Sequence, residues 1–236
     1  MVFVADESAY VGAYWGPRAE PVEACASRLR TFLTRLGALH PALAEWHATV
    51  DGPNDDSAPL KLDDDTLRDR LMRGRSRGDF DGQIIEDLGY RTSLWNGRED
   101  DWEAGIMVTC GVTADAVPNA VVLDPPFPTP HNTELFRPSI VRGMVEAAVE
   151  AWAPERAKFI TNSLDERQER LPLPQVGWLT YVTGEMPTDP PPAGAVMNPF
   201  GDGFFLRIGN EPLSVGAADV QQVRDWLGIG VPRLPD

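Results

Sequence analysis

The chain has 236 residues, which is enough for a substantial hydrophobic core, and its 42% hydrophobic and 24% charged content is typical of a globular protein. Its charge is unusual, because 21 Lys and Arg against 36 Asp and Glu give a net charge of −15. Such a chain repels nucleic acid, itself a dense polyanion, so direct binding to DNA or RNA is disfavoured. The same charge would attract a basic protein partner, although solubility alone explains it equally well.

The N-terminal segment, the apolar runs and the cysteine count bear on where the protein is located. The opening MVFVADESAY lacks the basic region and apolar stretch of a signal peptide, and no apolar run approaches the roughly 20 residues that a membrane helix needs. Two cysteines, Cys25 and Cys110, are too few for a disulfide scaffold, and they favour a reducing compartment. We therefore expect a soluble, cytoplasmic protein that does not associate with membranes.

The first predicted elements are a strand and a long helix. Tyr10–Trp15 (YVGAYW) is rich in aromatic side chains, which suit a pleated sheet. Pro21 fits the first turn of a helix, and Gly37 is the expected stop. Between them runs one apolar stripe at helical spacing, made of Val22, Cys25, Ala26, Leu29, Phe32, Leu33 and Leu36.

The next segment mixes short elements with turns. We expect a short helical piece at residues 41–46, a strand at 47–50 and a loop at 51–59. Asp63–Asp65 should cap a second helix, because carboxylates satisfy the amide groups at a helix N-terminus. Its inward side chains are predicted to be Leu67, Leu71 and Met72. A further short helix is expected over 79–88, capped by Asp79 or Asp81 and stopped by Gly89.

The remaining chain predicts strands interrupted by two helices. The strands are expected at 90–95, 102–112, 119–123, 157–161, 176–183 and 204–208, with a turn at Asn96-Gly97, and the helices at 138–152 and 215–227. Because strands and helices do not alternate regularly, we predict an α+β fold, with a mainly antiparallel sheet packed with several helices. We expect a single domain spanning 1–236, with a possible internal link at 124–137.

Catalytic motifs are absent from the chain. There is no G-x-G-x-x-G, G-x-x-x-x-G-K-[ST], G-x-S-x-G or H-E-x-x-H, and His40, His47 and His131 are scattered. We therefore predict no catalytic residues, no bound metal and no cofactor. Three acidic clusters, Asp63–Asp65, Asp79 with Asp81, and Glu99–Asp101, come closest to chemistry. They could hold a divalent cation, or they could form an acidic face presented to a basic partner.

The acidic clusters are also the leading candidates for partner binding. Trp15, Trp95 and Arg18 join the set, because aromatic side chains are enriched at the centres of interfaces, although aromatics are also common core residues and Arg18 could simply pair with a nearby acid. The predicted partner-binding residues are Asp63, Asp64, Asp65, Asp79, Asp81, Glu99, Asp100, Asp101, Trp15, Arg18 and Trp95.

Several segments spread along the chain carry a family resemblance. They are AYVGAYWGPRAE (Ala9–Glu20) with CASR (Cys25–Arg28), GRSRGDFDGQIIEDLGYRTSLWNG (Gly74–Gly97), Cys110-Gly111 and GWLTY (Gly177–Tyr181). Together, in this order and spacing, they resemble the immunity protein 52 family of bacterial polymorphic toxin loci. The resemblance covers most of the chain. It implies an antitoxin without enzymatic activity that binds and neutralises a cognate toxin, which for this family is a nuclease of restriction-endonuclease-like fold.

Two other functions stay open from the residues alone. The acidic clusters could serve a small cytoplasmic enzyme with a metal-assisted site, and binding of Mg²⁺, Mn²⁺ or Ca²⁺ would indicate it. The chain could also be a scaffold protein unrelated to toxins. The gene beside it would separate that function from immunity, because an immunity gene is expected to lie next to its toxin gene.

Overall fold

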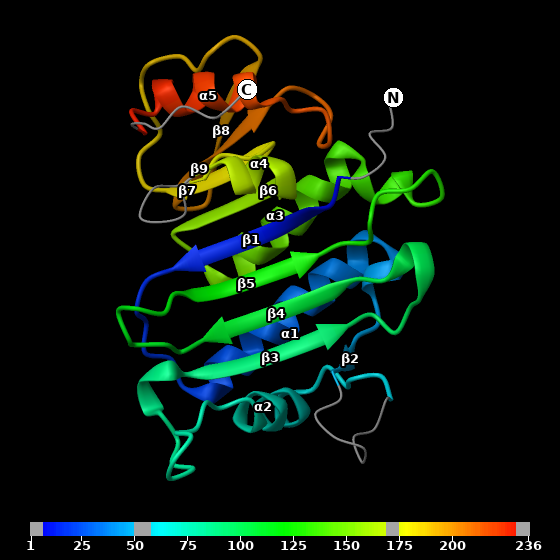
Figure 1. The fold of residues 1–236 in the computed structure, drawn as a ribbon, viewed down its shortest axis with the longest axis vertical. Helices are drawn as coiled ribbons and strands as arrows, with labels where there is room; N and C mark the ends of the chain where they lie inside the picture. The colour runs from blue at the N-terminus through cyan, green and yellow to red at the C-terminus, as the bar shows by residue number, and fades with distance from the viewer. Residues whose placement is uncertain (1–6, 50–57, 169–174, 230–236) are drawn as a thin grey trace.

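The computed structural model describes residues 7–49, 58–168 and 175–229. Its framework is one sheet with the strand order β2-β3-β4-β5-β1-β6-β7-β9-β8, in which every adjacent pair is antiparallel (Figure 1). The strands are β1 (Ala9–Trp15), β2 (His47–Ala48), β3 (Tyr90–Trp95), β4 (Gly105–Cys110), β5 (Asn119–Asp124), β6 (Arg156–Thr161), β7 (Leu179–Thr183), β8 (Ala195–Phe200) and β9 (Gly203–Ile208). The predicted α+β fold with an antiparallel sheet is confirmed.

The N-terminal strand lies at the centre of this sheet. β1 pairs with β5 on one side and with β6 on the other. The segment 124–137 leads from β5 into α3 (Pro138–Trp152), and the chain after α3 returns to the same sheet as β6, on the other side of β1.

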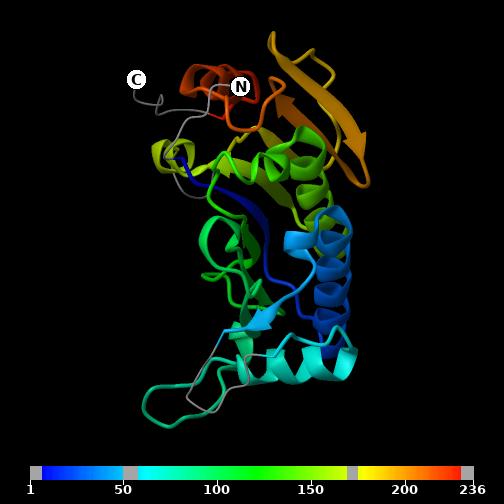
Figure 2. The ribbon, with the colours of Figure 1, turned by 90° about the vertical axis from the view of Figure 1, so that its right-hand side faces the viewer.

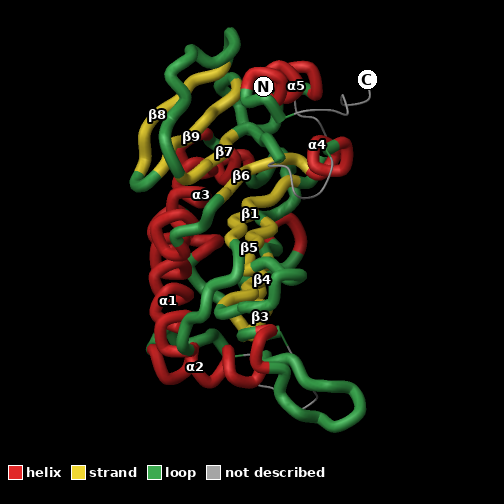
Figure 3. The backbone as a smooth tube through the Cα atoms, turned by 90° about the vertical axis from the view of Figure 1, so that its left-hand side faces the viewer, coloured by secondary structure: helices red, strands yellow, loops and turns green. Residues whose placement is uncertain are grey.

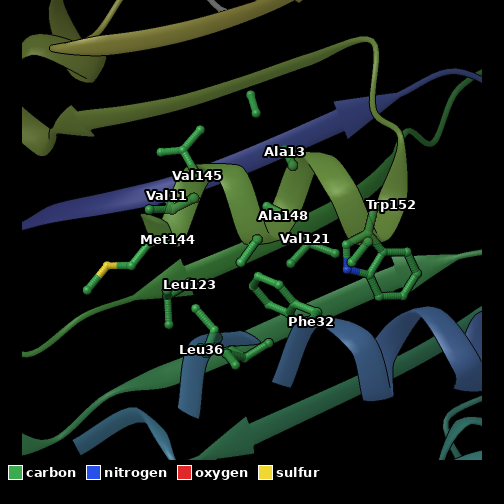
Figure 4. Packing of buried hydrophobic residues seen from close by; sticks show 14 of the residues in the cluster. Val11, Ala13, Phe32, Leu36, Val121, Leu123, Met144, Val145, Ala148 and Trp152 are labelled. Carbon is green, nitrogen blue, oxygen red and sulfur yellow. The ribbon is translucent and has the colours of Figure 1, made fainter. Parts of the chain in front are cut away.

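Two long helices cover one face of the sheet. They are α1 (Val22–Leu39) and α3 (Pro138–Trp152), and both lie on the same side of the strands in Figure 3. Six residues of the predicted α1 stripe are buried, from Cys25 to Leu36, and they meet the inward side chains of β1 and β5 (Figure 4). The helices approach closely at Gly143, where a Cβ atom would lie 2.5 Å from Cδ2 of Leu39. Burial of these apolar faces holds α1 and α3 on the sheet.

Among the described residues, helices cover the opposite face at one end. There α4 (Asn162–Arg167) and α5 (Ala217–Trp226) lie across from α1 and α3 (Figure 3). They belong to a second apolar cluster on the β6-β7-β9 end of the sheet, made of Ile160, Leu164, Val176, Leu206, Ile208, Val220, Val223 and Ile229. The part of this face on β3, β4, β5 and β1 has no such helix in the described chain, and we call it the open face.

The register of the strands identifies which side chains share the open face. Directly opposed residues in an antiparallel pair point to the same side of a sheet. One cross-strand row runs from β3 to β7 and consists of Ser93, Met107, Val122, Gly12, Lys158 and Thr180. The alternation that places Tyr10, Gly12 and Tyr14 on one face of β1 therefore puts both tyrosines on this side.

Several predicted boundaries in the first half of the chain are wrong. Gly37 lies inside α1, which ends at Leu39, and the helical piece after it is only the 3-10 turn η1 (Pro41–Leu43). The helix α2 (Asp64–Arg73) buries Leu67 and Leu71 as predicted, but Met72 is 40% exposed. The predicted strand at 47–50 is reduced to β2, and the predicted loop at 51–59 lies mostly outside the described residues.

The helix predicted over 79–88 is also wrong. This segment is a projecting loop that ends in the 3-10 turn η2 (Glu86–Leu88). A helix there would need an apolar face to bury, yet Ile85 is 36% exposed. The six-residue helix α4 and the edge strand β8 went unpredicted. β8 contains Pro199, which an edge strand tolerates because its missing N–H need not join the ladder.

Candidate partner-binding surface

A cavity of about 630 Å³ opens where the α4 end of the sheet meets the open face. Its floor comes from β1, β5, β6 and β7, with Tyr10, Tyr14, Val122, Lys158 and Thr180 among the lining residues. Its walls come from two loops, 16–17 and 115–118, and from α4. The volume falls in the range of about 300–1,000 Å³ that is usual for ligand pockets.

A buried ion pair forms the base of this cavity. Nζ of Lys158 lies 2.7 Å from Oδ1 of Asp165, and the two side chains are only 4% and 11% exposed. The hydroxyl of Tyr10 donates to the same Oδ1 over 2.7 Å, and Lys158 also donates to Oε1 of Gln175. Burial of both charges is tolerated because each has a partner of opposite sign and further hydrogen bonds.

The two tyrosines pack around the lysine. Nζ of Lys158 lies 4.9 Å from the ring centroid of Tyr10 and 5.8 Å from that of Tyr14, within the range of cation–π attraction. Tyr14 folds back along its own strand, and a Cβ atom at Gly12 would lie 2.5 Å from its hydroxyl. Glycine at position 12 therefore makes room for the ring. Burial, and then the neighbouring Tyr14 and Asp165, raise the pKa of the Tyr10 hydroxyl, so it remains a hydrogen-bond donor at neutral pH.

Carboxylates dominate the rim of the cavity. Five acidic and two basic side chains line it, and Lys158 is paired with Asp165 at the base. Asp115, Asp124 and Glu166 are exposed residues around the opening, whereas Glu155 accepts a hydrogen bond from the amide of Gly16. Desolvation raises the pKa of the Asp124 carboxyl, so the protein environment disfavours its negative charge. The rim therefore carries a surplus of negative charge close to apolar and aromatic surface.

A second feature is the loop of residues 75–88, which we call the finger loop. It projects from the end of the molecule where α2 lies, away from α1 and towards the side of the open face (Figures 2 and 3). At its tip Phe80 is fully exposed and stands between Asp79 and Asp81. An aromatic side chain so completely exposed gains nothing from folding, which makes it a candidate for contact with another molecule.

Hydrogen bonds within the finger loop define its shape. The amide of Gly78 donates to the carbonyl of Gln83 over 2.9 Å, and the amide of Ile85 donates to that of Ser76 over the same distance. Nη1 of Arg77 donates to the carbonyl of Gly82, and Asp81 accepts from the amide of Gln83. The loop is therefore a short hairpin that presents its tip in a defined geometry.

The structure does not bring the three predicted acidic clusters together. Asp63 caps α2, where it accepts from the amide of Thr66 over 2.8 Å, and this hydrogen bond lowers its pKa. Asp64 pairs with Arg30, and Asp65 is exposed in the same turn. The finger loop follows the other end of α2. Glu99–Asp101 lies beyond the far end of β3, around the turn η3 (Asp100–Trp102).

Among the described residues, no group of three His, Cys, Asp or Glu side chains could hold a metal ion.

Two of the predicted partner-binding residues have structural roles. Trp15 is 3% exposed and stacks on Trp152 with ring centroids 5.6 Å apart, so its ring packs in the core, although the residue also lines the cavity. Arg18 donates to the carbonyls of Trp152 and Ala153, at the C-terminal end of α3, and pairs with Glu20. A cation in that position satisfies carbonyl groups that the helix leaves unpaired.

Trp95 has a different setting. It is half-buried at the end of β3, on the open face, with its ring 5.5 Å from that of His47. Met107, on the neighbouring strand, is 53% exposed on the same face. These side chains give the open face apolar surface beyond the cavity.

The cavity itself was not predicted from the sequence. Its one available signal was Lys158, a charged residue inside the apolar strand segment AKFIT, because lysine is almost never fully buried without a partner. Asp165 lies seven residues further on, in a helix too short to show helical periodicity. Nothing in the sequence indicated that these two residues meet Tyr10, 148 positions before Lys158.

Comparisons with known proteins identify a family and similar solved structures. The family model described as Immunity protein 52 matches residues 7–221. Among solved structures, the chain is similar to "Pseudomonas aeruginosa T6SS protein PA0821", with a TM-score of 0.53 and 12% sequence identity, covering 94% of this chain and 72% of that one. At this identity the likeness concerns the fold alone. No curated protein matches the chain.

No helix in the described residues is both long and apolar enough to cross a membrane.

Proposed function

The chain belongs to the immunity protein 52 family, and from this premise we propose that it binds a cognate bacterial toxin and neutralises it. The match to residues 7–221 is the observation that carries the proposal. We propose further that the toxin is a nuclease, that the complex forms in the cytoplasm, and that the protein itself neither catalyses a reaction nor binds nucleic acid.

Charge supports a nuclease as the partner. A nuclease needs a positive cleft to hold phosphates, and a protein of net charge −15 competes with nucleic acid for such a cleft. Long-range attraction between the two proteins also speeds their encounter at low salt. Inhibition then requires only a tight complex, typically with about 1,600 Å² of total buried surface.

We place the docking surface on the open face. This face has exposed apolar side chains such as Met107, a cavity with an acidic rim, and the finger loop at one end. A basic toxin resting there would meet carboxylates at the rim and Asp79 and Asp81 at the finger tip. The helix-covered face has its apolar side chains buried against α1 and α3 and has less to offer a partner.

The Pseudomonas aeruginosa protein of similar fold is described as a T6SS protein. A role in competition between bacteria, in which a delivered toxin must be neutralised inside cells of its own kind, goes beyond that description and is our proposal. We extend that setting to this chain as part of the proposal.

Rescue of growth tests the proposed function. The toxin domain encoded by the adjacent gene is expressed from an inducible promoter, alone or with this protein, and growth and chromosomal DNA integrity are followed. We expect the toxin alone to stop growth and fragment DNA, and co-expression to restore both. An unrelated protein of similar size and net charge serves as the control. Undiminished killing with both proteins present would contradict the proposal.

A further inference from the structure

We infer that the cavity on the open face receives a positively charged side chain, arginine or lysine, from the bound toxin. The inference rests on the proposed function and adds a recognition site to it. Its ligand is a guanidinium or ammonium group projecting from a basic protein surface, rather than a free small molecule, because the cavity opens on the face where we place the partner.

The charges around the cavity favour a cation. Two basic side chains line the cavity, Lys158, which is neutralised at the base by Asp165, and the half-buried Arg156. The exposed rim carboxylates of Asp115, Asp124 and Glu166 outnumber them around the opening. A cation beside Asp124 would offset the desolvation that disfavours its negative charge in the unbound protein. An anionic ligand would instead meet the same carboxylates with like charge.

The cavity also suits the apolar stem of such a side chain. Arginine and lysine carry their charge on a long chain of methylene groups, which pack well on apolar surface. Val122, Val117 and the rings of Tyr10 and Tyr14 supply that surface around the acidic rim. The buried ion pair and the hydrogen bond from Tyr10 hold this floor in place before the partner arrives, and a preorganised site binds at lower cost.

The affinity of rim variants for the toxin tests the inference. Asp124→Asn and Glu166→Gln each remove one charge without changing size, and Asp189→Asn, in the exposed loop between β7 and β8 and outside the cavity lining, is the matched control. We expect the double rim variant to weaken toxin binding about tenfold or more. The control should change the Kd less than about twofold. Melting temperatures confirm that all variants are folded.

Salt dependence separates a site in the cavity from general attraction. Screening by about 0.5 M NaCl removes most of the effect of exposed charges but little of that of a partly desolvated pair. We therefore expect the loss of affinity in the double rim variant to persist at high salt.

A second experiment follows the NMR signals of the four tyrosines of the chain, labelled in their rings. On toxin binding the signals of Tyr10 and Tyr14 should move, while that of Tyr181, buried on the helix side, should stay.

Two results would overturn the inference, and they can be told apart. If the wild-type protein binds the toxin and the rim variants bind equally well, with unmoved Tyr10 and Tyr14 signals, the inference fails and the proposed function stands. If the wild-type protein does not bind the toxin at all, the proposed function fails and the inference fails with it. If the rim variants do bind more weakly, an alanine scan of toxin arginines and lysines identifies the occupant. It is the residue whose substitution changes the binding free energy non-additively with Asp124→Asn.

Discussion

Lys158 on β6 and Asp165 on α4 form an ion pair of 2.7 Å in which both side chains are nearly inaccessible to solvent. The pair fixes the short helix α4 against the strand that precedes it, and it lies directly under the cavity. The hydroxyl of Tyr10 donates to the same carboxylate and so connects the pair to the central strand β1.

Breaking this pair should be costly. Lys158→Met leaves Asp165 buried without its cation, and removing one partner of a buried pair typically costs about 3–5 kcal/mol of stability. Chemical denaturation would measure the loss. The control is Arg30→Met, which breaks the exposed pair with Asp64 and should cost less than about 1 kcal/mol. Equal losses in the two variants would contradict this role for the Lys158–Asp165 pair.

Asp124 should lower stability at neutral pH. Desolvation raises the pKa of the Asp124 carboxyl in the folded state. As the pH rises, the unfolded state therefore loses this proton first, and the free energy of unfolding falls. The fall ends once the carboxyl has ionised in the folded state as well. Asp124→Asn removes the penalty. We expect a higher melting temperature than wild type at pH 7 and no difference at a pH below about 3, where both states are protonated. A lower melting temperature at pH 7 would contradict the raised pKa of the Asp124 carboxyl in the folded protein.

If Asp124 also contacts the toxin, stability and function oppose each other at this residue. The variant would then be more stable as a free protein and weaker as a binder. Such opposition is common where a binding site keeps charged groups in a partly desolvated setting. Melting and binding measurements on the same preparation would show it.

The acidic tip of the finger loop should control the association rate. Asp79→Lys with Asp81→Lys reverses two exposed charges beside Phe80, and steering by exposed charges acts mainly on the rate of encounter. We expect slower association with the toxin and a weaker dependence on salt, measured by stopped flow. Asp189→Lys with Asp202→Lys makes the same change in net charge in loops near β8 and β9, at the opposite edge of the sheet. If both double variants slow association equally, total charge rather than the finger loop is responsible.

Neither cysteine should react in the native protein. Cys25 and Cys110 are buried free thiols, and Cys25 lies on the apolar stripe of α1. Hydrogen bonding with Cys25, followed by burial, raises the pKa of the Cys110 thiol well above its usual value, which keeps the reactive thiolate scarce. We expect no reaction with a thiol reagent at neutral pH and two equivalents after denaturation. Fast labelling of the folded protein would contradict this packing.

The sequence predicted the helix-covered half of the fold well because burial leaves a periodic pattern. α3 was predicted over the residues that form it, and the stripe of α1 continues to Leu36 as expected. The finger loop was missed because its isoleucines suggested a helix, although no surface exists there to bury one. The edge strand β8 was missed because its Asn198-Pro199 sequence is atypical of strands in a sheet interior.

The candidate site was harder to predict than the fold. Clusters of acidic residues near in sequence, such as Asp63–Asp65 and Glu99–Asp101, lie at separate places in the structure. The residues that do converge, Tyr10, Lys158 and Asp165, come from segments far apart in the chain, and only the strand order places them together. The pairing of β1 with β6 is a long-range property, which local composition cannot reveal.

We propose that this protein binds and inhibits a toxin, and both properties can be measured on one preparation. The most direct measurement mixes the purified protein with the purified product of the adjacent toxin gene, determines the stoichiometry and affinity by calorimetry, and assays DNA cleavage on the same mixtures. We expect a tight complex of fixed stoichiometry, and cleavage that falls to background when the two proteins are present in that ratio. The absence of a complex, together with cleavage that is unchanged by an excess of this protein, would contradict it.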